Sequence, residues 1–416
     1  MKATGNLLGT ILDLGREMMV TGAEVWRVED MLEKLFDAYC FKDWEVWVVS
    51  SCLAATVYTW DDREYTQIRI IKGRNYDLDK LERLYRLAEE VFETPTSVSA
   101  IRMKVNTIIE APGLPLLQTY IATVMAGVGF AIFYNGSLMD AFVVCIMSLA
   151  FTAYTRRIGR MINNMLAFNI VGAFIIEMIA LAAMAGGIGH NLAAITTAGI
   201  LLLAGGLGIA NGIGDFLHGD TLAGVGETST SLLGAAGIAI GIYMSMLFFR
   251  KYLNTQVTAV EGANLAADPG IQLIACTVGC AGFVLMFGAR KKALLYSTAG
   301  SYLTWFVYLY AVNELKCDFF IATMVSACFI ALFASLVNAF TGIPSAIFLT
   351  LCVFPLLPGS NLYYTVFGTV SNNAELFRSQ GRAMLLIALG IALGYITMDV
   401  VSNIIQIIRN TYFRRV

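Results

Sequence analysis

Charged residues are scarce in this sequence. Lys, Arg, Asp and Glu make up 14% of its 416 residues, and hydrophobic residues make up 57%. Soluble globular proteins carry about 25% charged residues. The formal net charge of −2 gives no electrostatic basis for binding nucleic acid. With a mean hydropathy of +0.69, the composition predicts an integral membrane protein that has the lipid bilayer as a partner.

Metal ligands are equally sparse. The chain has 2 His, and its 8 Cys are spread singly. Cys276 and Cys280 lie one helical turn apart in an apolar segment, with no second Cys or His pair nearby. A metal pair is one interpretation, and two small apolar side chains facing a neighbouring helix is the better one. No phosphate-binding loop is present, so we expect neither a metal nor another cofactor.

The first twenty residues contain no long uncharged stretch. Asp13, Arg16 and Glu17 recur at helical spacing there, so we expect an amphipathic helix and no signal peptide. A period of two follows over residues 44–71, and helical periodicity returns over 77–110. Residues 1–112 are therefore predicted to form a small α+β domain. It shows no nucleophile and base pair, which argues against an enzyme.

One polar group in this domain stands out. Arg27, Glu29 and Asp30 follow one another closely on the second predicted helix. They form either a polar site or ordinary surface ion pairs. If the domain gates or regulates the membrane part, Arg27 and Glu29 are its candidate gating residues.

Long apolar runs fill the rest of the chain. A membrane span needs about 20 apolar residues, and ten segments approach this length, although the ninth must continue past Pro358. They are 116–134, 138–154, 162–187, 192–214, 223–249, 271–289, 293–312, 318–340, 344–357 and 383–408. The sequence therefore predicts an α-helical polytopic membrane protein with about ten transmembrane helices.

Basic residues set the expected orientation. Three clusters fall on one side of ten alternating spans: Arg156, Arg157 and Arg160; Arg290, Lys291 and Lys292; and Arg409, Arg414 and Arg415. The positive-inside rule makes that side the cytoplasm. Arg250 and Lys251 fall on the other side. We expect a multi-pass protein of the plasma membrane with its N-terminal domain and its C-terminus in the cytoplasm.

Ten spans divide into two halves, 113–250 and 251–416. Five spans per half would invert the halves relative to each other. Segment starts recur at a shift of about 153 residues, and two helix-breaking runs, 204–215 and 357–364, match at this shift. Paired breaks of this kind point to a transporter binding site. The alternative is close helix packing through small residues, as in Gly208-x-x-x-Gly212 or Gly237-x-x-x-Gly241. For these isolated glycine pairs we favour packing. For the clustered run that ends in Asp215 we favour a functional break, since packing does not call for Asn211 and Asp215 beside so many glycines.

Three ionisable residues lie inside apolar segments: Glu177, Glu227 and Asp399. A charge at mid-bilayer costs at least about 2.5–3.5 kcal/mol, which makes each a candidate for carrying protons. Glu177 is the deepest, and its alternative role is a hydrogen-bonded structural carboxyl. Glu227, near the start of its segment, could instead be interfacial.

Asp215, His218 and Asp220 form a compact polar set. Their spacing fits no common metal site, because three ligands would fall within six residues with a glycine between them. We expect a polar lip at the cytoplasmic end of the pathway, with His218 in a gating role.

Three motifs resemble the threonine/serine exporter (ThrE-like) family in its fused form. The stretch TGAEVWRVED at 21–30 resembles the family signature G-A-E-x-x-R-V-E-D. The run 205–224 is similar to P-G-x-P-L-x-N-A-I-x-D-x-x-x-G-D-x-x-x-G, and residues 358–363 match P-G-S-x-L-Y. The positions that match the second motif are Asn211, Asp215, Gly219, Asp220 and Gly224. Departures from the family pattern occur at Gly205, Gly208, Ile209, Glu227 (where the resemblance implies Arg) and Thr230 (where it implies Glu).

The resemblance implies export of small polar metabolites, with threonine and serine as the named substrates. We therefore expect a proton-linked secondary transporter, an antiporter. Its candidate substrate-binding residues are Asn211, Asp215, Asp220, Ser360, Asn361 and Tyr364. The alternatives are a dicarboxylate exporter, a channel, or a membrane-bound enzyme or sensor acting through the N-terminal domain. A homo-oligomer is compatible with the sequence.

Overall fold

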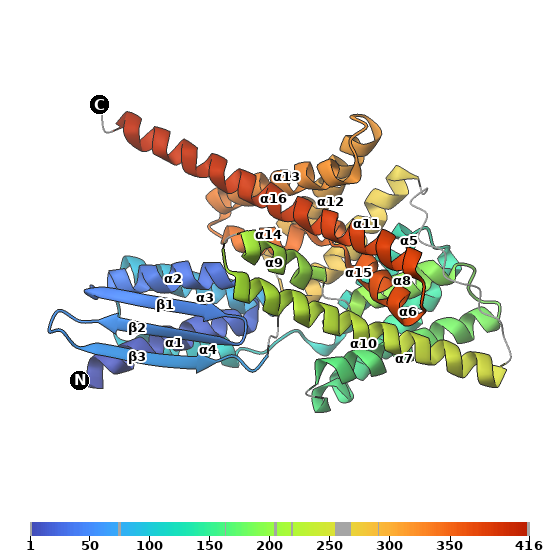
Figure 1. The fold of residues 1–416 in the computed structure, drawn as a ribbon, viewed down its shortest axis with the longest axis horizontal. Helices are drawn as coiled ribbons and strands as arrows, with labels where there is room; N and C mark the ends of the chain where they lie inside the picture. Colours follow the sequence, from blue (N-terminus) through green and yellow to red (C-terminus); the bar gives the residue numbers. More distant parts are fainter. Residues whose placement is uncertain are drawn as a thin grey trace. The chain divides into compact units, whose positions relative to one another are not determined.

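The computed structural model describes residues 2–73, 76–162, 164–203, 206–217, 219–253, 268–289 and 291–413 (Figure 1). The chain forms two compact units. The first consists of residues 1–115, 211–227 and 287–290, and the second of residues 116–210, 228–286 and 291–416. Two short stretches from later in the chain therefore belong to the same unit as the N-terminal residues.

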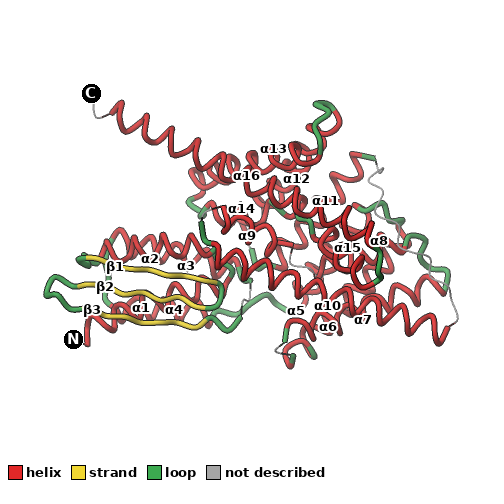
Figure 2. The backbone as a smooth tube through the Cα atoms, viewed as in Figure 1, coloured by secondary structure: helices red, strands yellow, loops and turns green. Residues whose placement is uncertain are grey.

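The N-terminal part of the first unit is a three-stranded antiparallel sheet covered on one face by helices (Figures 1 and 2). Its elements are α1 (Lys2–Thr21), α2 (Val25–Ala38), β1 (Asp43–Val49), β2 (Cys52–Tyr58), β3 (Glu64–Ile70), α3 (Leu78–Glu93) and α4 (Val98–Glu110). Alternation along β2 buries Leu53, Ala55 and Val57, as the period of two predicts. Asp77 caps α3 by accepting from the backbone N–H of Lys80.

The rest of the described chain is helical. Its elements are α5 (Leu116–Phe133), α6 (Leu138–Arg157), the 3₁₀ turn Gly159–Met161, α7 (Met165–Ala185), α8 (Leu192–Leu203), α9 (Gly206–Leu217), α10 (Thr221–Leu253), α11 (Pro269–Met286), α12 (Lys291–Asn313), α13 (Phe319–Thr341), α14 (Ser345–Cys352), the 3₁₀ turn Phe354–Leu356, α15 (Gly359–Val370) and α16 (Ala374–Phe413). Seven of the described helices are long and apolar enough to cross a membrane. An eighth span is reached if the bent pair of α14 and α15 counts as one. The protein is thus a polytopic helical membrane protein.

With the bent pair counted as the eighth span, the predicted spans differ from the observed ones in two places. The predicted seventh span, 293–312, coincides with α12, which is not among the seven. The predicted fourth span, 192–214, falls on the short helix α8 and on α9, and residues 204–205 between them lie outside the described part of the chain.

Helix starts repeat along the chain. The starts of α5, α6, α8, α9 and α10 are Leu116, Leu138, Leu192, Gly206 and Thr221, and those of α11, α12, α14, α15 and α16 are Pro269, Lys291, Ser345, Gly359 and Ala374. Each start in the second set follows its counterpart in the first by the same 153-residue offset. The remaining pair, α7 and α13, begins at Met165 and Phe319, an offset of 154. These offsets agree with the shift expected from the sequence.

The counterparts α5 and α11 pack directly against each other through glycines. A Cβ atom added to Gly129 would lie 2.8 Å from the Ala275 carbonyl oxygen, and one added to Gly282 would lie 2.7 Å from that of Ala122. The 153-residue offset relates Gly129 to Gly282. It also relates Ala122 to Ala275, so the two contacts are copies of one another. Such reciprocity is the mark of a two-fold interface. Because a step forward along α5 matches a step back along α11, the two helices run in opposite directions.

The turn before α10 also recurs before α16. The Asp220 N–H donates to the Asp215 carbonyl at 2.9 Å, and the Asn373 N–H donates to the Gly368 carbonyl at 2.7 Å. Gly219 (φ +94°) and Asn372 (φ +56°) occupy the same left-handed position of this turn. The repeat therefore keeps the backbone of the turn, while the two carboxylates of its first copy become Gly368 and Asn373 in the second.

Both predicted helix breaks fall where one described helix ends and another begins. Helices α14 and α15 are inclined by 54° across Leu357 and Pro358, as predicted. The predicted run 204–215 begins where α8 ends, at Leu203, and its residues 206–215 belong to the separate helix α9, while residues 204–205 lie outside the described part of the chain. Each helical glycine costs about 1 kcal/mol, but here glycines permit close packing: a Cβ atom on Gly224 would lie 2.7 Å from the Gly212 carbonyl oxygen.

Candidate functional site

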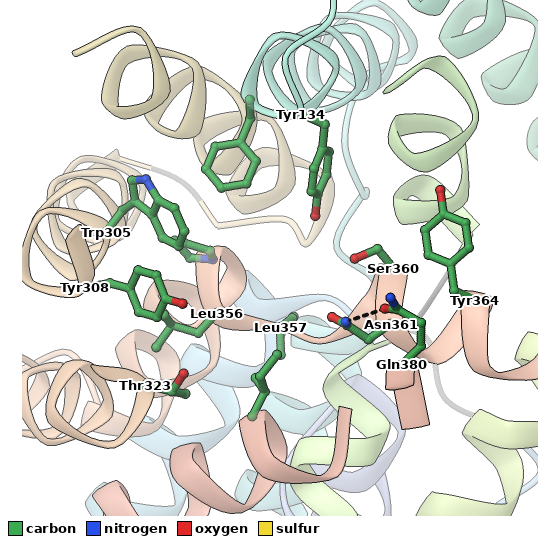
Figure 3. Close-up of a pocket in the computed structure, with 13 residues that line it drawn as sticks. Tyr134, Trp305, Tyr308, Thr323, Leu356, Leu357, Ser360, Asn361, Tyr364 and Gln380 are labelled. Carbon is green, nitrogen blue, oxygen red and sulfur yellow. Dashed lines mark hydrogen bonds between the residues drawn. The ribbon is translucent and has the colours of Figure 1, made fainter. Parts of the chain in front are cut away.

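A cavity of about 230 Å³ lies at the bend between α14 and α15, in the second unit (Figure 3). Side chains from α5, α12, α13, α15, α16 and the bend itself line it. They are Phe133, Tyr134, Trp305, Tyr308, Thr323, Pro355, Leu356, Leu357, Ser360, Asn361, Tyr364, Gln380 and Ile387. Three of the predicted substrate-binding residues, Ser360, Asn361 and Tyr364, therefore share one cavity.

Polar groups gather on one side of this cavity. The Asn361 side-chain Nδ2 donates to Gln380 Oε1 at 2.9 Å, and the Tyr134 hydroxyl points toward Ser360 (Figure 3). Helix α15 begins at Gly359, next to the cavity, and Pro358 supplies no side-chain cap. The first N–H groups of a helix have no partner within it, so the start of α15 adds backbone donors to these side-chain groups.

The other side of the cavity is aromatic. The rings of Trp305 and Tyr308 stack at 4.7 Å with an interplanar angle of 13°, and the ring of Phe133 meets Trp305 edge-on at 4.8 Å. None of the described residues that line the cavity is charged. A dry cavity of about 150 Å³ holds benzene, which has six heavy atoms, so this one suits a ligand of roughly eight or nine. The cavity thus fits a small polar solute without net charge.

Glu177, the predicted proton carrier, lies on α7 and is completely buried. Its Oε2 accepts a hydrogen bond from the Thr196 hydroxyl of α8 at 2.9 Å. Within the described part of the chain, its Oε1 has no hydrogen-bond partner. A single neutral donor compensates little of the cost of burying a carboxylate, so Glu177 is not held as a well-satisfied structural carboxylate would be.

A second hydrogen bond from α8 reaches the cavity. The hydroxyls of Thr197 and Tyr364 lie 2.9 Å apart, and both side chains are buried. Consecutive residues of α8 therefore contact the carboxyl of Glu177 and the cavity-lining ring of Tyr364. Neither threonine leaves a signal in the sequence, because a threonine in an apolar helix ordinarily bonds its own backbone.

The other buried carboxyl of the first membrane helices has a different environment. Asp140 starts α6 and accepts four hydrogen bonds, at 2.7–3.0 Å, from Ser137, His190 and Asn191. Three come from backbone N–H groups and one from the Ser137 hydroxyl. These bonds tie the α5–α6 turn to the α7–α8 turn. Asp140 is thus a fully satisfied structural carboxylate, whereas Glu177 is not.

The remaining predicted pathway residues lie elsewhere. Asn211, Asp215 and Glu227 belong to the first unit, where Asp215 and Glu227 are buried and Asn211 is half-buried. Asp399 lies on α16 and is exposed. His218, the predicted gating residue, falls outside the described residues.

Glu29, the other predicted gating carboxyl, lies close to Asp220 within the first unit. Burial raises the pKa of Glu29 to about 7, and the charges of Asp220 and Glu33 act in the same direction. Arg27 pairs with Glu24 and stacks over the Trp26 ring at 4.2 Å. The carboxylates of Glu29 and Asp220, which belong to two different sequence motifs, are therefore close enough to repel each other.

The cysteine pair lies in the helical core of the second unit. The sulfur atoms of Cys276 and Cys280 are 3.8 Å apart, and both side chains are buried. Over the described ranges, no group of three or more His, Cys, Asp or Glu side chains could hold a metal ion.

Comparisons with known proteins agree with this architecture. Residues 9–249 match the family described as "Putative threonine/serine exporter", and residues 272–401 match "Threonine/Serine exporter, ThrE". The chain is 24% identical over 384 residues to the "Probable threonine/serine exporter" of Mycobacterium tuberculosis (strain ATCC 25618 / H37Rv), covering 89% of this chain and 71% of that protein. No solved structure matches. The chain therefore belongs to the threonine/serine exporter family.

Proposed function

We propose that this transporter exports threonine and serine by secondary transport. The observation that carries the proposal is the uncharged cavity at the α14–α15 bend, where Ser360, Asn361 and Gln380 face stacked aromatic rings. Threonine and serine have eight and seven heavy atoms, within the roughly eight or nine that the cavity suits. Both are zwitterions with a hydroxyl, so amide and hydroxyl groups can bind them without a net counter-charge.

We further propose that protons drive export through Glu177. This carboxyl is buried, holds one hydrogen bond and leaves Oε1 without a partner in the described part of the chain, which suits a group that takes up and releases a proton. Asp399 and Glu227 are secondary candidates. Asp215, Asp220 and Asn211 would serve the pathway from the first half of the repeat.

The proposed topology has ten spans in two inverted halves, 113–250 and 251–416. The 153-residue offset of helix starts and the reciprocal, antiparallel packing of α5 and α11 support it. Residues 1–112 would form a cytoplasmic domain on the same side as the C-terminus. Glu29 beside Asp220 would let that domain gate the pathway.

The test is flux in proteoliposomes that contain the purified chain, with labelled threonine, serine and succinate, each with and without a pH gradient. We expect gradient-driven movement of threonine and serine and none of succinate. Movement of succinate alone would favour the dicarboxylate alternative. It would also contradict the proposed role of the cavity, because an uncharged cavity would then have to admit a dianion. Downhill flux that no gradient can reverse would indicate a channel.

Glu177→Gln separates coupling from binding. The variant should lose gradient-driven accumulation and keep exchange of labelled for unlabelled threonine, because exchange moves no net proton. Asp399→Asn and Glu227→Gln serve as parallel arms. Full gradient-driven flux in Glu177→Gln would remove this residue from the mechanism.

A further inference from the structure

Two consecutive threonines of α8 bridge groups that belong to different halves of the repeat. Thr196 donates to Glu177 Oε2 at 2.9 Å, and Thr197 shares a hydrogen bond with the Tyr364 hydroxyl at 2.9 Å. Glu177 and α8 come from the first half, and Tyr364 lies on α15 in the second. All four side chains are at least nine-tenths buried, so water does not compete for these hydrogen bonds.

Tyr364 faces two ways. Its ring lines the cavity, while its hydroxyl points away from Asn361 and Gln380 (Figure 3) and reaches Thr197. The same ring packs in a buried cluster with Ala173 of α7 and Ile200 of α8. A ligand in the cavity that displaces this ring must therefore strain or break the bond to Thr197.

The buried polar groups around Glu177 are incompletely satisfied. Among the described residues, Glu177 Oε1 and the Tyr363 hydroxyl both lack a hydrogen-bond partner. If Tyr364 moves and pulls on Thr197, the adjacent residue Thr196 moves as well. That movement would alter the single hydrogen bond that the Glu177 carboxyl accepts.

We propose that Thr197 and Tyr364 are positioning residues that couple the occupancy of the cavity to the protonation of Glu177. The inference rests on the proposed function and adds the path between its two sites. Binding in the cavity and protonation of Glu177 then influence each other through the Thr197–Tyr364 hydrogen bond, and removal of either hydroxyl leaves two sites that work independently. By linkage the influence is reciprocal.

The chain offers a matched control for Thr197. Thr350 is its counterpart on α14, at the 153-residue offset of the repeat. The Thr350 hydroxyl donates to the Ala346 carbonyl of its own helix at 3.0 Å. Thr350→Val thus removes the equivalent hydroxyl without touching the link, and Thr197→Ser keeps the hydroxyl that Thr197→Val removes.

The experiment measures the rate at which a hydrophobic carbodiimide labels Glu177 in the purified full-length protein. The reagent takes the proton of the protonated carboxyl, and the carboxylate oxygen then adds to its central carbon. Rates are read by mass spectrometry with and without saturating L-threonine, and threonine binding is measured on the same samples. Couplings between sites typically span about 5- to 150-fold, so in the wild type we expect threonine to change the rate by about 5-fold or more. The ratio should fall to near one in Thr197→Val, Tyr364→Phe and the double variant, and stay at the wild-type value in Thr197→Ser and Thr350→Val.

Three outcomes overturn the inference. Thr197→Val could keep the wild-type ratio, Thr350→Val could lose it as fully as Thr197→Val does, or the wild type could bind threonine without any change in labelling. In each of these cases the proposed function survives, because threonine still binds. An absence of threonine and serine binding in the wild type overturns both proposals together.

Discussion

Phe130 of α5 and Phe283 of α11 are counterparts at the 153-residue offset of the repeat, and their rings meet edge to face with centroids 5.4 Å apart. A residue that contacts its own counterpart lies close to the two-fold axis that relates the repeats. The glycines on either side allow the two backbones to approach closely at this point. The contact between α5 and α11 therefore combines closely packed glycines with this aromatic pair.

This packing predicts that Gly282 tolerates no larger residue. A Cβ atom there would lie 2.7 Å from the Ala122 carbonyl oxygen, and neighbouring backbone cannot yield as a flexible side chain can. We expect Gly282→Val to destabilise the protein by about 1–3 kcal/mol or more, seen as a lower unfolding temperature in detergent. Gly113→Ala is the control, since nothing lies within 4 Å of its added Cβ. Equal unfolding temperatures for the two variants would contradict the close approach.

Asp140 and Glu177 predict opposite behaviour for the two buried carboxyls. Asp140→Asn replaces one acceptor oxygen by an NH₂ group that faces N–H donors, at a cost of about 1–3 kcal/mol for each buried group left unpaired. Thermal unfolding should therefore occur at lower temperature, with the KM for threonine unchanged. Glu177→Gln should show the reverse: a nearly unchanged unfolding temperature and lost proton coupling. A result with the two roles exchanged would refute our assignment.

The amide pair of the cavity predicts a shared loss. Asn361→Ala or Gln380→Ala removes one member of a 2.9 Å hydrogen bond, and a lost hydrogen bond is worth roughly 1 kcal/mol or somewhat more. We expect kcat/KM for threonine transport to fall about 10-fold in either variant. The double variant should lose little more, because contacting residues are not additive. Ser371→Ala, at an exposed hydroxyl past the end of α15, should transport normally, and fully additive losses would show that the pair does not act together.

Glu29 predicts a pH-dependent stability. Its pKa is about 7 in the folded protein against an ordinary 4.5, so between these values the folded state binds more protons than the unfolded state. Stability due to this group is therefore present below pH 4.5 and is lost as the pH rises toward 7. Glu29→Gln should raise the unfolding temperature more at pH 8 than at pH 4.5. Glu45→Gln, at an exposed position of β1, should show no such difference, and a pH-independent effect of Glu29→Gln would argue against the burial of its charge.

How much of this was accessible from the sequence depends on whether a residue leaves a local signal. Pro358 and Gly359 predict the bend between α14 and α15, and the motif around them predicts Ser360 and Asn361 as site residues. Trp305 and Tyr308 leave no such signal, because two aromatic residues three apart on an apolar helix look like ordinary core. Gln380 lies outside every motif, and only the fold brings it to Asn361.

The glycine-rich run 204–215 shows that the low helix propensity of glycine does not keep a segment from being helical in a membrane protein. The glycines between 204 and 215 suggested a break, yet residues 206–215 are helical. In a bilayer the backbone must satisfy its own hydrogen bonds, and residues 206–215 do so as part of α9, which follows the end of α8 at Leu203. The close packing expected for the isolated pair Gly237 and Gly241 is present, since Cβ atoms there would collide with the carbonyl oxygens of Leu166 and Ile170 on α7.

The reciprocal face between α5 and α11 has a consequence for how such a protein assembles. A surface that fits its own repeat is self-complementary, so a chain with only one half would present the same face to a second copy inserted in the opposite sense. Fusing both copies converts that encounter into an intramolecular one with a high effective concentration. Pairing of the two halves would then not depend on the concentration of the chain. In a fused chain a substitution can change one half alone, whereas in a dimer of single-half chains it would change both. The two turns show such a difference in side chains on one backbone: Asp215 and Asp220 stand in one, and Gly368 and Asn373 in the other.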